Sequence, residues 1–126
     1  MPTSRGGDRI FNPIIKAKTA SYTCTAQESG VTFTNRGATA AIVFTLPAIT
    51  ACPAGTEFTF QSISAYGFTV TATTACIVAV NNAGRTNIAC TTATNIIGCT
   101  LRVISDGVGW LTFEGTGPAV ASYAQS

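Results

Sequence analysis

The chain contains no histidine, and charged residues make up only 10% of its 126 positions. Without histidine, neither a Ser-His-Asp triad, nor a Cys-His pair, nor a histidine-containing metal site can form. The cysteines show no C-x-x-C spacing either, which argues against a zinc site. The sequence therefore predicts a protein that is not an enzyme, with no catalytic, cofactor-binding or metal-binding residues.

Charge is scarce for a globular protein, in which about 25% of residues are usually charged. The apolar fraction of 46% is ordinary, and a chain this apolar is not expected to be disordered. A weakly charged exterior tends to associate. We therefore expect further copies of the chain, or a partner, to cover much of the surface. The net charge of +2 is too small to indicate nucleic-acid binding.

Long apolar runs are also missing, since no stretch approaches the roughly 18–20 residues that span a membrane. The first residues, MPTSRGGDRIFNPIIKAK, lack the apolar core of a signal peptide. We therefore expect no membrane association, and folding in the cytoplasm of the cell that makes the protein.

From residue 19 onward, apolar and polar residues alternate in short runs, with the period of two that is typical of half-buried strands. Phe58 and Phe60, for example, share one face of such a run. Glycine, asparagine and serine turns separate the runs, and helical spacing is absent. The sequence predicts an all-β fold: a single antiparallel β-sandwich or jelly-roll-like barrel over residues 19–117, followed by a tail over residues 118–126.

Residues 1–18 are expected to form an extended N-terminal arm, because Gly6, Gly7 and Pro13 interrupt them and no periodicity survives. The arm is basic, while the remainder of the chain is slightly acidic. It is either a solvated tail or, as we favour, an arm that docks on a neighbour through charge and apolar contact. The candidate docking residues are Arg5, Arg9, Phe11, Ile14, Ile15, Lys16 and Lys18.

Near the C-terminus, the segment LRVISDGVGWLTFEG predicts a hairpin whose turn contains Asp106 and Gly107. Alternation places Leu111 and Phe113 on one side of the second strand and Trp110 on the other. We expect Leu111 and Phe113 to face the core, and Trp110 to cover a sheet surface or a contact between subunits. The alternative is an exposed Trp110 that stacks on a sugar ring.

The carboxylates outside the arm are Glu28, Glu57, Asp106 and Glu114. A pair of carboxylates in a cleft can hydrolyse a glycan. The turn positions of Asp106 and Glu28 favour a structural role instead, because aspartate before glycine is selected for its local backbone hydrogen bonds. We therefore expect these groups to serve turns and surfaces.

The five cysteines are an odd number, so they cannot all pair within one chain. Cys24 and Cys99 lie in strand-like runs and suit small buried side chains, whereas Cys52 and Cys90 lie in loop-like or polar stretches. We hypothesise that one or more loop cysteines form disulfides between subunits after leaving the reducing cytoplasm. The disulfide candidates are Cys52, Cys90, Cys24, Cys76 and Cys99.

A family resemblance rests on YTCTAQESGVTFTNRGATAAIVFTLP, then GTEFTFQSISAYGFTVTA, and then the closing LRVISDGVGWLTFEG. In this order the stretches resemble a β-domain of bacteriophage virions, found in head-decoration (cement) proteins, head fibres and tail fibres. The resemblance covers residues 22–115 and implies a β-sandwich that oligomerises, often as a homotrimer. The chain lacks the long shaft of a tail fibre, and its cysteines are not required by such domains.

The resemblance and the short chain together favour a capsid decoration protein. Such a protein sits on the outside of the virion shell, contacts the major capsid protein and further copies of itself, bridges capsid subunits and stabilises the particle. The alternative is a head-fibre or tail-fibre domain that binds a host receptor or glycan, for which Tyr66, Trp110 and Tyr123 are the aromatic candidates. Neither reading involves a cofactor, nucleic acid or a membrane.

Overall fold

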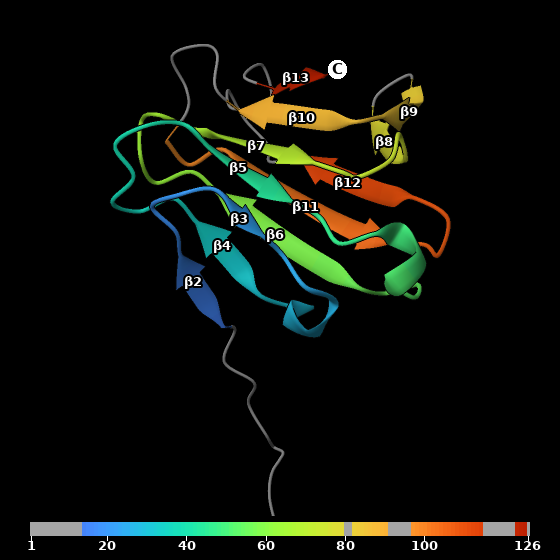
Figure 1. Ribbon diagram of the computed structural model, residues 1–126. Helices are drawn as coiled ribbons and strands as arrows, with labels where there is room; N and C mark the ends of the chain where they lie inside the picture. The colour runs from blue at the N-terminus through green and yellow to red at the C-terminus, as the bar shows by residue number, and fades with distance from the viewer. Residues whose placement is uncertain (1–13, 80–81, 91–96, 115–122, 126) are drawn as a thin grey trace, which may run out of the picture.

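The computed structural model describes residues 14–79, 82–90, 97–114 and 123–125 (Figure 1). Its regular elements there are short strands and two 3₁₀ turns, η1 (Ala26–Glu28) and η2 (Ile49–Ala51). The strands form two sheets that pack face to face around one core. The all-β fold that the alternating pattern predicts is confirmed.

The first sheet has five strands in the order β13-β10-β7-β5-β3. They are β3 (Tyr22–Thr23), β5 (Ile42–Thr45), β7 (Phe68–Thr71), β10 (Asn87–Cys90) and β13 (Tyr123–Gln125). The second sheet has seven strands in the order β2-β4-β6-β11-β12-β8-β9 and runs from lower left to upper right in Figure 1. They are β2 (Ile15–Ala17), β4 (Thr32–Thr34), β6 (Glu57–Gln61), β8 (Ile77–Ala79), β9 (Asn82–Arg85), β11 (Thr100–Ser105) and β12 (Trp110–Glu114).

The strand directions differ from the antiparallel arrangement expected, because both sheets are mixed. From β2 to β7 the chain changes sheet at every connection, so that consecutive strands lie in opposite layers. Successive passes through one sheet then run in the same direction, and the pairs β2–β4, β4–β6, β3–β5 and β5–β7 are parallel. Alternation within a strand indicates its buried face, but it carries no information on which sheet the strand joins.

Aromatic side chains from both sheets form the centre of the core. Phe33, Phe58 and Phe60 of the seven-stranded sheet are fully buried, as are Phe44 and Phe68 of the five-stranded sheet. The ring centroid of Phe44 lies 5.0 Å from that of Phe60 and 5.7 Å from that of Phe33, so rings of opposite sheets are in contact. Aromatic pairs at such distances contribute about 0.5–1.5 kcal/mol each beyond the area that they bury.

The C-terminal hairpin predicted around Asp106 and Gly107 is confirmed, since β11 pairs antiparallel with β12. Asp106 Oδ1 accepts hydrogen bonds from the backbone N–H groups of Val108 (2.9 Å) and Gly109 (2.8 Å), which closes the turn. A Cβ atom at Gly109 would lie 2.6 Å from the carbonyl oxygen of Cys76. The close approach of the chain just before β8 therefore requires glycine at this position.

Both ends of the domain extend beyond the predicted boundaries. Within the arm predicted over residues 1–18, Ile15–Ala17 forms β2 and pairs with β4. Within the tail predicted over residues 118–126, Tyr123–Gln125 forms β13 and pairs with β10. Each of these edge strands has three residues, too few for a period of two to stand out in the sequence.

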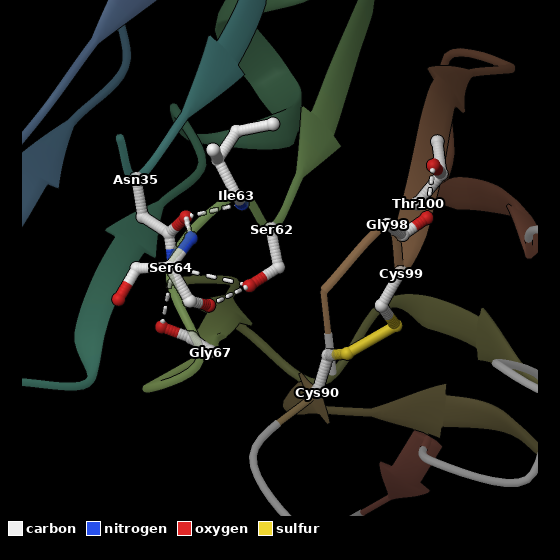
Figure 2. Close-up of a disulfide and its surroundings, with 9 residues drawn as sticks. All are labelled: Asn35, Ser62, Ile63, Ser64, Gly67, Cys90, Gly98, Cys99 and Thr100. Atoms are coloured by element: carbon white, nitrogen blue, oxygen red, sulfur yellow. Dashed lines mark hydrogen bonds between the residues drawn. A yellow bond between two sulfur atoms is a disulfide. The ribbon is translucent and has the colours of Figure 1, made fainter. Parts of the chain in front are cut away.

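Buried Asn35 joins two loops at one end of the sandwich (Figure 2). Its Nδ2 group donates to the Gly67 carbonyl oxygen (3.1 Å) and to the Ser62 hydroxyl (3.2 Å). Its Oδ1 atom accepts from the backbone N–H groups of Ile63 (2.7 Å) and Ser64 (2.9 Å). The connection between β6 and β7 is therefore fixed to the chain that follows β4.

Replacing Asn35 by alanine removes these hydrogen bonds and takes the acceptor from two backbone N–H groups. We expect Asn35→Ala to lower the free energy of unfolding by about 2–4 kcal/mol, since each buried polar group left unpaired costs about 1–3 kcal/mol. Urea unfolding followed by tryptophan fluorescence measures this loss. Gln61→Ala, at a half-buried outward position of β6, is the control and should cost less than about 1 kcal/mol. Equal losses in the two variants would contradict the prediction.

Candidate functional site

The outward side of the seven-stranded sheet carries an apolar patch over β8, β11 and β12. Strand register places Leu111 between Ile104 of β11 and Val78 of β8. Phe113 continues the same face of β12 beside Arg102. Phe113 is 51% exposed, and the other three apolar side chains are half-buried. We refer to Val78, Ile104, Leu111 and Phe113 as the outer sheet patch.

The orientation expected for the second strand of the hairpin is wrong. Trp110 is fully buried, with its ring centroid 5.8 Å from that of Phe58, whereas Phe113 points outward. Cross-strand partners share one face of a sheet, and Trp110 pairs with buried Ser105. The inward face of β11 therefore fixes the inward face of β12. Trp110 is available neither for a subunit contact nor for stacking on a sugar.

Two exposed isoleucines mark the opposite edge of the same sheet. Ile14 is 60% exposed and Ile15 is 66% exposed, and β2 is the outermost strand there. Both were expected to dock on a neighbour, and their exposure leaves them accessible. The docking candidates Arg5, Arg9 and Phe11 lie outside the described residues.

Lys16 and Lys18, which we expected to bind a neighbour, contact their own chain instead. Lys16 pairs in register with Phe33, which faces the core, so the Lys16 side chain follows the inward side of β2. Its Nζ atom lies 2.7 Å from Glu28 Oε2. The Nζ atom of Lys18 lies 3.8 Å from the centroid of the Tyr22 ring. These two cations therefore anchor β2 to the sandwich.

Glu28 is the centre of this polar cluster. Its Oε2 atom accepts hydrogen bonds from Lys16 Nζ (2.7 Å) and the Tyr22 hydroxyl (2.7 Å), and its Oε1 atom accepts from the Thr25 backbone N–H (2.9 Å). Burial alone raises the pKa of Glu28, but the hydrogen bonds from Lys16, Tyr22 and Thr25 outweigh it and lower the pKa to about 2. The carboxylate is thus held ionised and links β2, β3 and η1.

Two further carboxylates also have structural partners. Glu57 Oε1 lies 2.7 Å from an Arg102 guanidinium nitrogen across neighbouring strands. The backbone N–H groups of Gly109 and then Val108 lower the pKa of Asp106, because they bond to its ionised form. The turn role predicted for Asp106 is confirmed. The side chain of Glu114 lies outside the described part of the chain.

Cys90 forms a disulfide with Cys99 within the chain, which corrects the expectation that Cys90 bonds another subunit (Figure 2). Cys90 ends β10 of the five-stranded sheet, and Cys99 directly precedes β11 of the seven-stranded sheet. The bond therefore joins the two layers. Cys90 stands in a polar stretch of sequence, but it shares the inward face of β10 with Ile88, which brings its sulfur into the core.

The remaining cysteines are free, and Cys24 and Cys52 are buried. Burial, and then the negative charge of Glu28, raises the pKa of the Cys24 thiol to about 12. Cys24 is buried as expected. Cys52 was expected in an exposed loop, but it is 1% exposed, and burial raises the pKa of its thiol. Cys52 is therefore inaccessible to a thiol of another subunit in this fold, and Cys76 is the free thiol that is partly exposed.

A shallow depression of about 280 Å³ lies beside Cys76. Its volume is at or below the low end of ligand-binding pockets, which hold about 300–1,000 Å³. Asp106 contributes to the wall, but its carboxylate caps the hairpin turn. The depression therefore combines one thiol with mainly apolar walls. Its lining residues are Ala75, Cys76, Val78, Ala83, Asp106, Val108 and Gly109.

Tyr66 is 54% exposed at the end of the sandwich where Asn35 lies. Its backbone N–H donates to the Ser64 hydroxyl (3.2 Å), and the Ser64 backbone N–H is bonded to Asn35, so the loop is anchored from inside. Ile97 is a second exposed apolar residue, at 66%. Tyr66 is thus accessible, as the fibre alternative requires, while the side chain of Tyr123 lies outside the described residues.

Sequence reasoning missed the Glu28 cluster and the outer sheet patch. The spacing Thr25-x-x-Glu28 is a capping box, and this is the sequence signal that could have identified the Glu28 cluster. The alternation of Leu111 and Phe113 is visible in the sequence, but only the partner strand determines which side of β12 faces water.

Among the described residues, no group of three or more acidic or cysteine side chains is placed to hold a metal ion. No helix in the described part of the chain is long and apolar enough to cross a membrane. Neither family models nor curated proteins match the chain.

The Glu28 cluster makes stability depend on pH in a defined direction. A carboxyl group with a lowered folded pKa stabilises the protein above its unfolded pKa, about 4.3 for glutamate, and loses that contribution as the pH falls toward its folded pKa. With a folded pKa of about 2, the loss falls between about pH 5 and pH 2. We expect Glu28→Gln to lower the free energy of unfolding at pH 7 by about 2 kcal/mol. The variant should also lose less stability than the wild-type protein between about pH 5 and pH 2.

Urea unfolding at a series of pH values measures both effects. Glu57→Gln is the matched control, because it breaks an ion pair that is partly exposed and should cost less than about 1 kcal/mol at pH 7. If the Glu28→Gln variant lost as much stability at acid pH as the wild-type protein, Glu28 would not be the cause of that loss.

The positions of the cysteines predict graded thiol reactivity. An aromatic disulfide reagent should titrate one thiol per folded chain, Cys76, because Cys24 and Cys52 are buried and thiol reactivity requires access and ionisation. In urea without reductant the count should rise to three, since Cys90 and Cys99 are bonded to each other. Cys76→Ser should remove the reaction of the folded protein. A count of five in urea would show that the disulfide is absent.

Proposed function

We propose that the protein is a capsid decoration (cement) protein, which binds the outside of an assembled virion shell and bridges neighbouring capsid subunits. Two lines of support carry the proposal. The motifs over residues 22–115 resemble virion β-domains of this type. The described surface also offers exposed apolar side chains, while its carboxylates serve turns and strand contacts.

The observation that carries the proposal furthest is the position of β2. Among the described strands it lies at one edge of the seven-stranded sheet, and two cations, Lys16 within it and Lys18 just after it, contact the sandwich. The arm residues that precede β2 in the sequence are therefore continuous with this edge of the sheet, and we propose that they bind a neighbouring surface. The docking candidates among them are Arg5, Arg9 and Phe11.

The function would be mechanical. Each copy contributes modestly, but many copies on a lattice add their contacts, and each one tethers neighbouring capsid subunits. A protein that binds the assembled shell and not its separated subunits stabilises the assembled state by mass action. An interlocked aromatic core and a disulfide between the layers suit a domain that must transmit force between its contacts.

The alternative, a fibre domain that binds a host receptor or glycan, is supported by exposed Tyr66 on its anchored loop. The burial of Trp110 weakens it, because an exposed tryptophan was its main sugar-stacking candidate. We therefore place decoration first and retain Tyr66 as the residue that the fibre alternative would use.

Removal of residues 1–12 tests the proposed function, since it deletes the basic segment and leaves β2 in place. We expect the truncated protein to keep its melting temperature and to bind shells assembled from the major capsid protein at least about tenfold more weakly. Co-sedimentation with expanded shells measures binding, and Tyr66→Ser is the control, which should bind as the wild-type protein does. Cryo-electron microscopy of virions should show the protein in a regular array on the shell. Density confined to a tail or fibre would refute decoration.

A further inference from the structure

We propose that β2 is a detachable strand, which leaves the sandwich while the rest of the domain stays folded, and that the Lys16–Glu28 ion pair is the latch that holds it closed. Among the described strands, β2 lies at one edge of the seven-stranded sheet and pairs with β4 alone (Figure 1). The inference goes beyond the proposed function and does not depend on it, because every contact that supports it lies within one chain.

The residues of β2 and its two neighbours contribute no side chain to the described core. Ile14, Ile15 and Ala17 are exposed, and the two lysines of this segment are half-buried. Burial of apolar surface is the main force that holds a protein together, and no side chain of β2 provides it. The strand is therefore held by backbone hydrogen bonds to β4 and by polar side-chain contacts.

The backbone ladder between β2 and β4 is short. The Thr32 N–H donates to the Ile14 carbonyl oxygen (2.9 Å), and the Lys18 N–H donates to the Thr34 carbonyl oxygen (2.8 Å). The paired stretch of β2 has three residues, so few bonds must break for it to leave. Segments with few buried apolar contacts and an exposed backbone are the ones that open locally.

Lys16 supplies the contact that joins β2 to a distant part of the chain. Its Nζ atom lies 2.7 Å from Glu28 Oε2, and the two residues are 12 positions apart in the sequence. Lys18 contacts the ring of Tyr22 in the next strand, β3, so that contact acts where the segment rejoins the domain. Within the described part of the chain, the ion pair is thus the side-chain contact that resists removal of β2.

The elements around β2 keep contacts of their own when it leaves. Phe33 of β4 is fully buried, and β4 is paired with β6 on its other side. Glu28 stays bonded to the Tyr22 hydroxyl and the Thr25 backbone N–H. The centroid of the Tyr22 ring lies 5.5 Å from that of Phe33, which keeps β3 packed on the core. Opening is therefore expected to end before Tyr22.

Opening would lengthen the segment that precedes the sandwich. It adds residues 14–20, which span up to about 23 Å when fully extended. A partner that binds this segment more tightly in its extended form would shift β2 toward the open state by that difference in affinity. β2 would close again when the partner leaves. The strand would thus act as a strap that adjusts how far the N-terminal segment reaches from the domain.

Amide hydrogen exchange of the full chain, followed by NMR spectroscopy, tests whether β2 opens by itself. The N–H groups of Lys18 and Thr32 bond across the β2–β4 ladder, whereas the Thr59 N–H of β6 bonds to the Val31 carbonyl oxygen just before β4 (3.2 Å). We expect protection factors at Lys18 and Thr32 to be at least about tenfold lower than at Thr59 and independent of low urea concentrations. Protection of Thr59 should fall as urea is added, because unfolding of the sandwich exposes it.

Lys16→Met tests the latch, since it removes the charge and keeps an unbranched side chain. Protection at Lys18 and Thr32 should fall by at least about tenfold, because a hydrogen bond to a charged group is worth that much or more, while circular dichroism stays unchanged. Arg102→Met is the matched control. It breaks a second ion pair, with Glu57, whose cation has a similar exposed fraction of 46% against 39% for Lys16. It should leave the exchange at Lys18 and Thr32 unchanged.

Three results would overturn the proposal. Equal protection and an equal response to urea at Lys18, Thr32 and Thr59 would show that β2 leaves only when the whole domain unfolds. Low protection at Lys18 alone would show that the end of the strand frays while β2 stays paired with β4. Unchanged protection in Lys16→Met would show that the ion pair is not the latch. The outcome is separate from that of the proposed function, because these measurements involve no shell.

Discussion

The contacts between aromatic rings of the two sheets are the interaction on which the rest of the structure depends. Phe44 of the five-stranded sheet touches Phe33 and Phe60 of the seven-stranded sheet, and Phe60 also touches Phe68. Strands of two to six residues bury little apolar area individually, so large side chains must supply the packing. Trp110 joins this set through Phe58 and thereby fixes the inward face of the C-terminal hairpin.

The packing also determines what is left on the outside. Once Trp110 faces inward, the alternation of β12 directs Leu111 and Phe113 to the surface, where they meet Ile104 and Val78. In the same way, the inward direction of Lys16 places Ile15, its neighbour in β2, on the exposed side of the strand. The apolar surfaces of this molecule therefore consist of outward-facing side chains of β12 and β2. The inward-facing side chains of the same strands pack in the core or bind Glu28. This explains how a chain with so few charges combines one core with two exposed apolar surfaces.

Patterns contained within single strands could be read from the sequence, and relations between strands could not. The alternation at Phe58 and Phe60, and the Asp106–Gly107 turn, each depend on neighbouring residues and were predicted correctly. The parallel pairs, the face of Trp110 and the Cys90–Cys99 bond depend on which strands become neighbours across long stretches of chain. The candidate site divides similarly. Ile14 and Ile15 were named as docking candidates from their place in the predicted arm, whereas the outer sheet patch exists only because three strands lie side by side.

The disulfide has a consequence for engineering. Cys90 and Cys99 are nine residues apart in sequence, and each is held in a different layer, so the chain between them starts and finishes at covalently joined points. Lengthening a closed loop costs little, about 0.6 kcal/mol for each doubling of its length. A foreign peptide inserted there would be attached at both ends to cysteines that are bonded to each other, and the register of β10 and β11 would stay unchanged. If the copies coat a lattice, each would present that peptide at a regular spacing, and the domain would serve as a scaffold for antigen display.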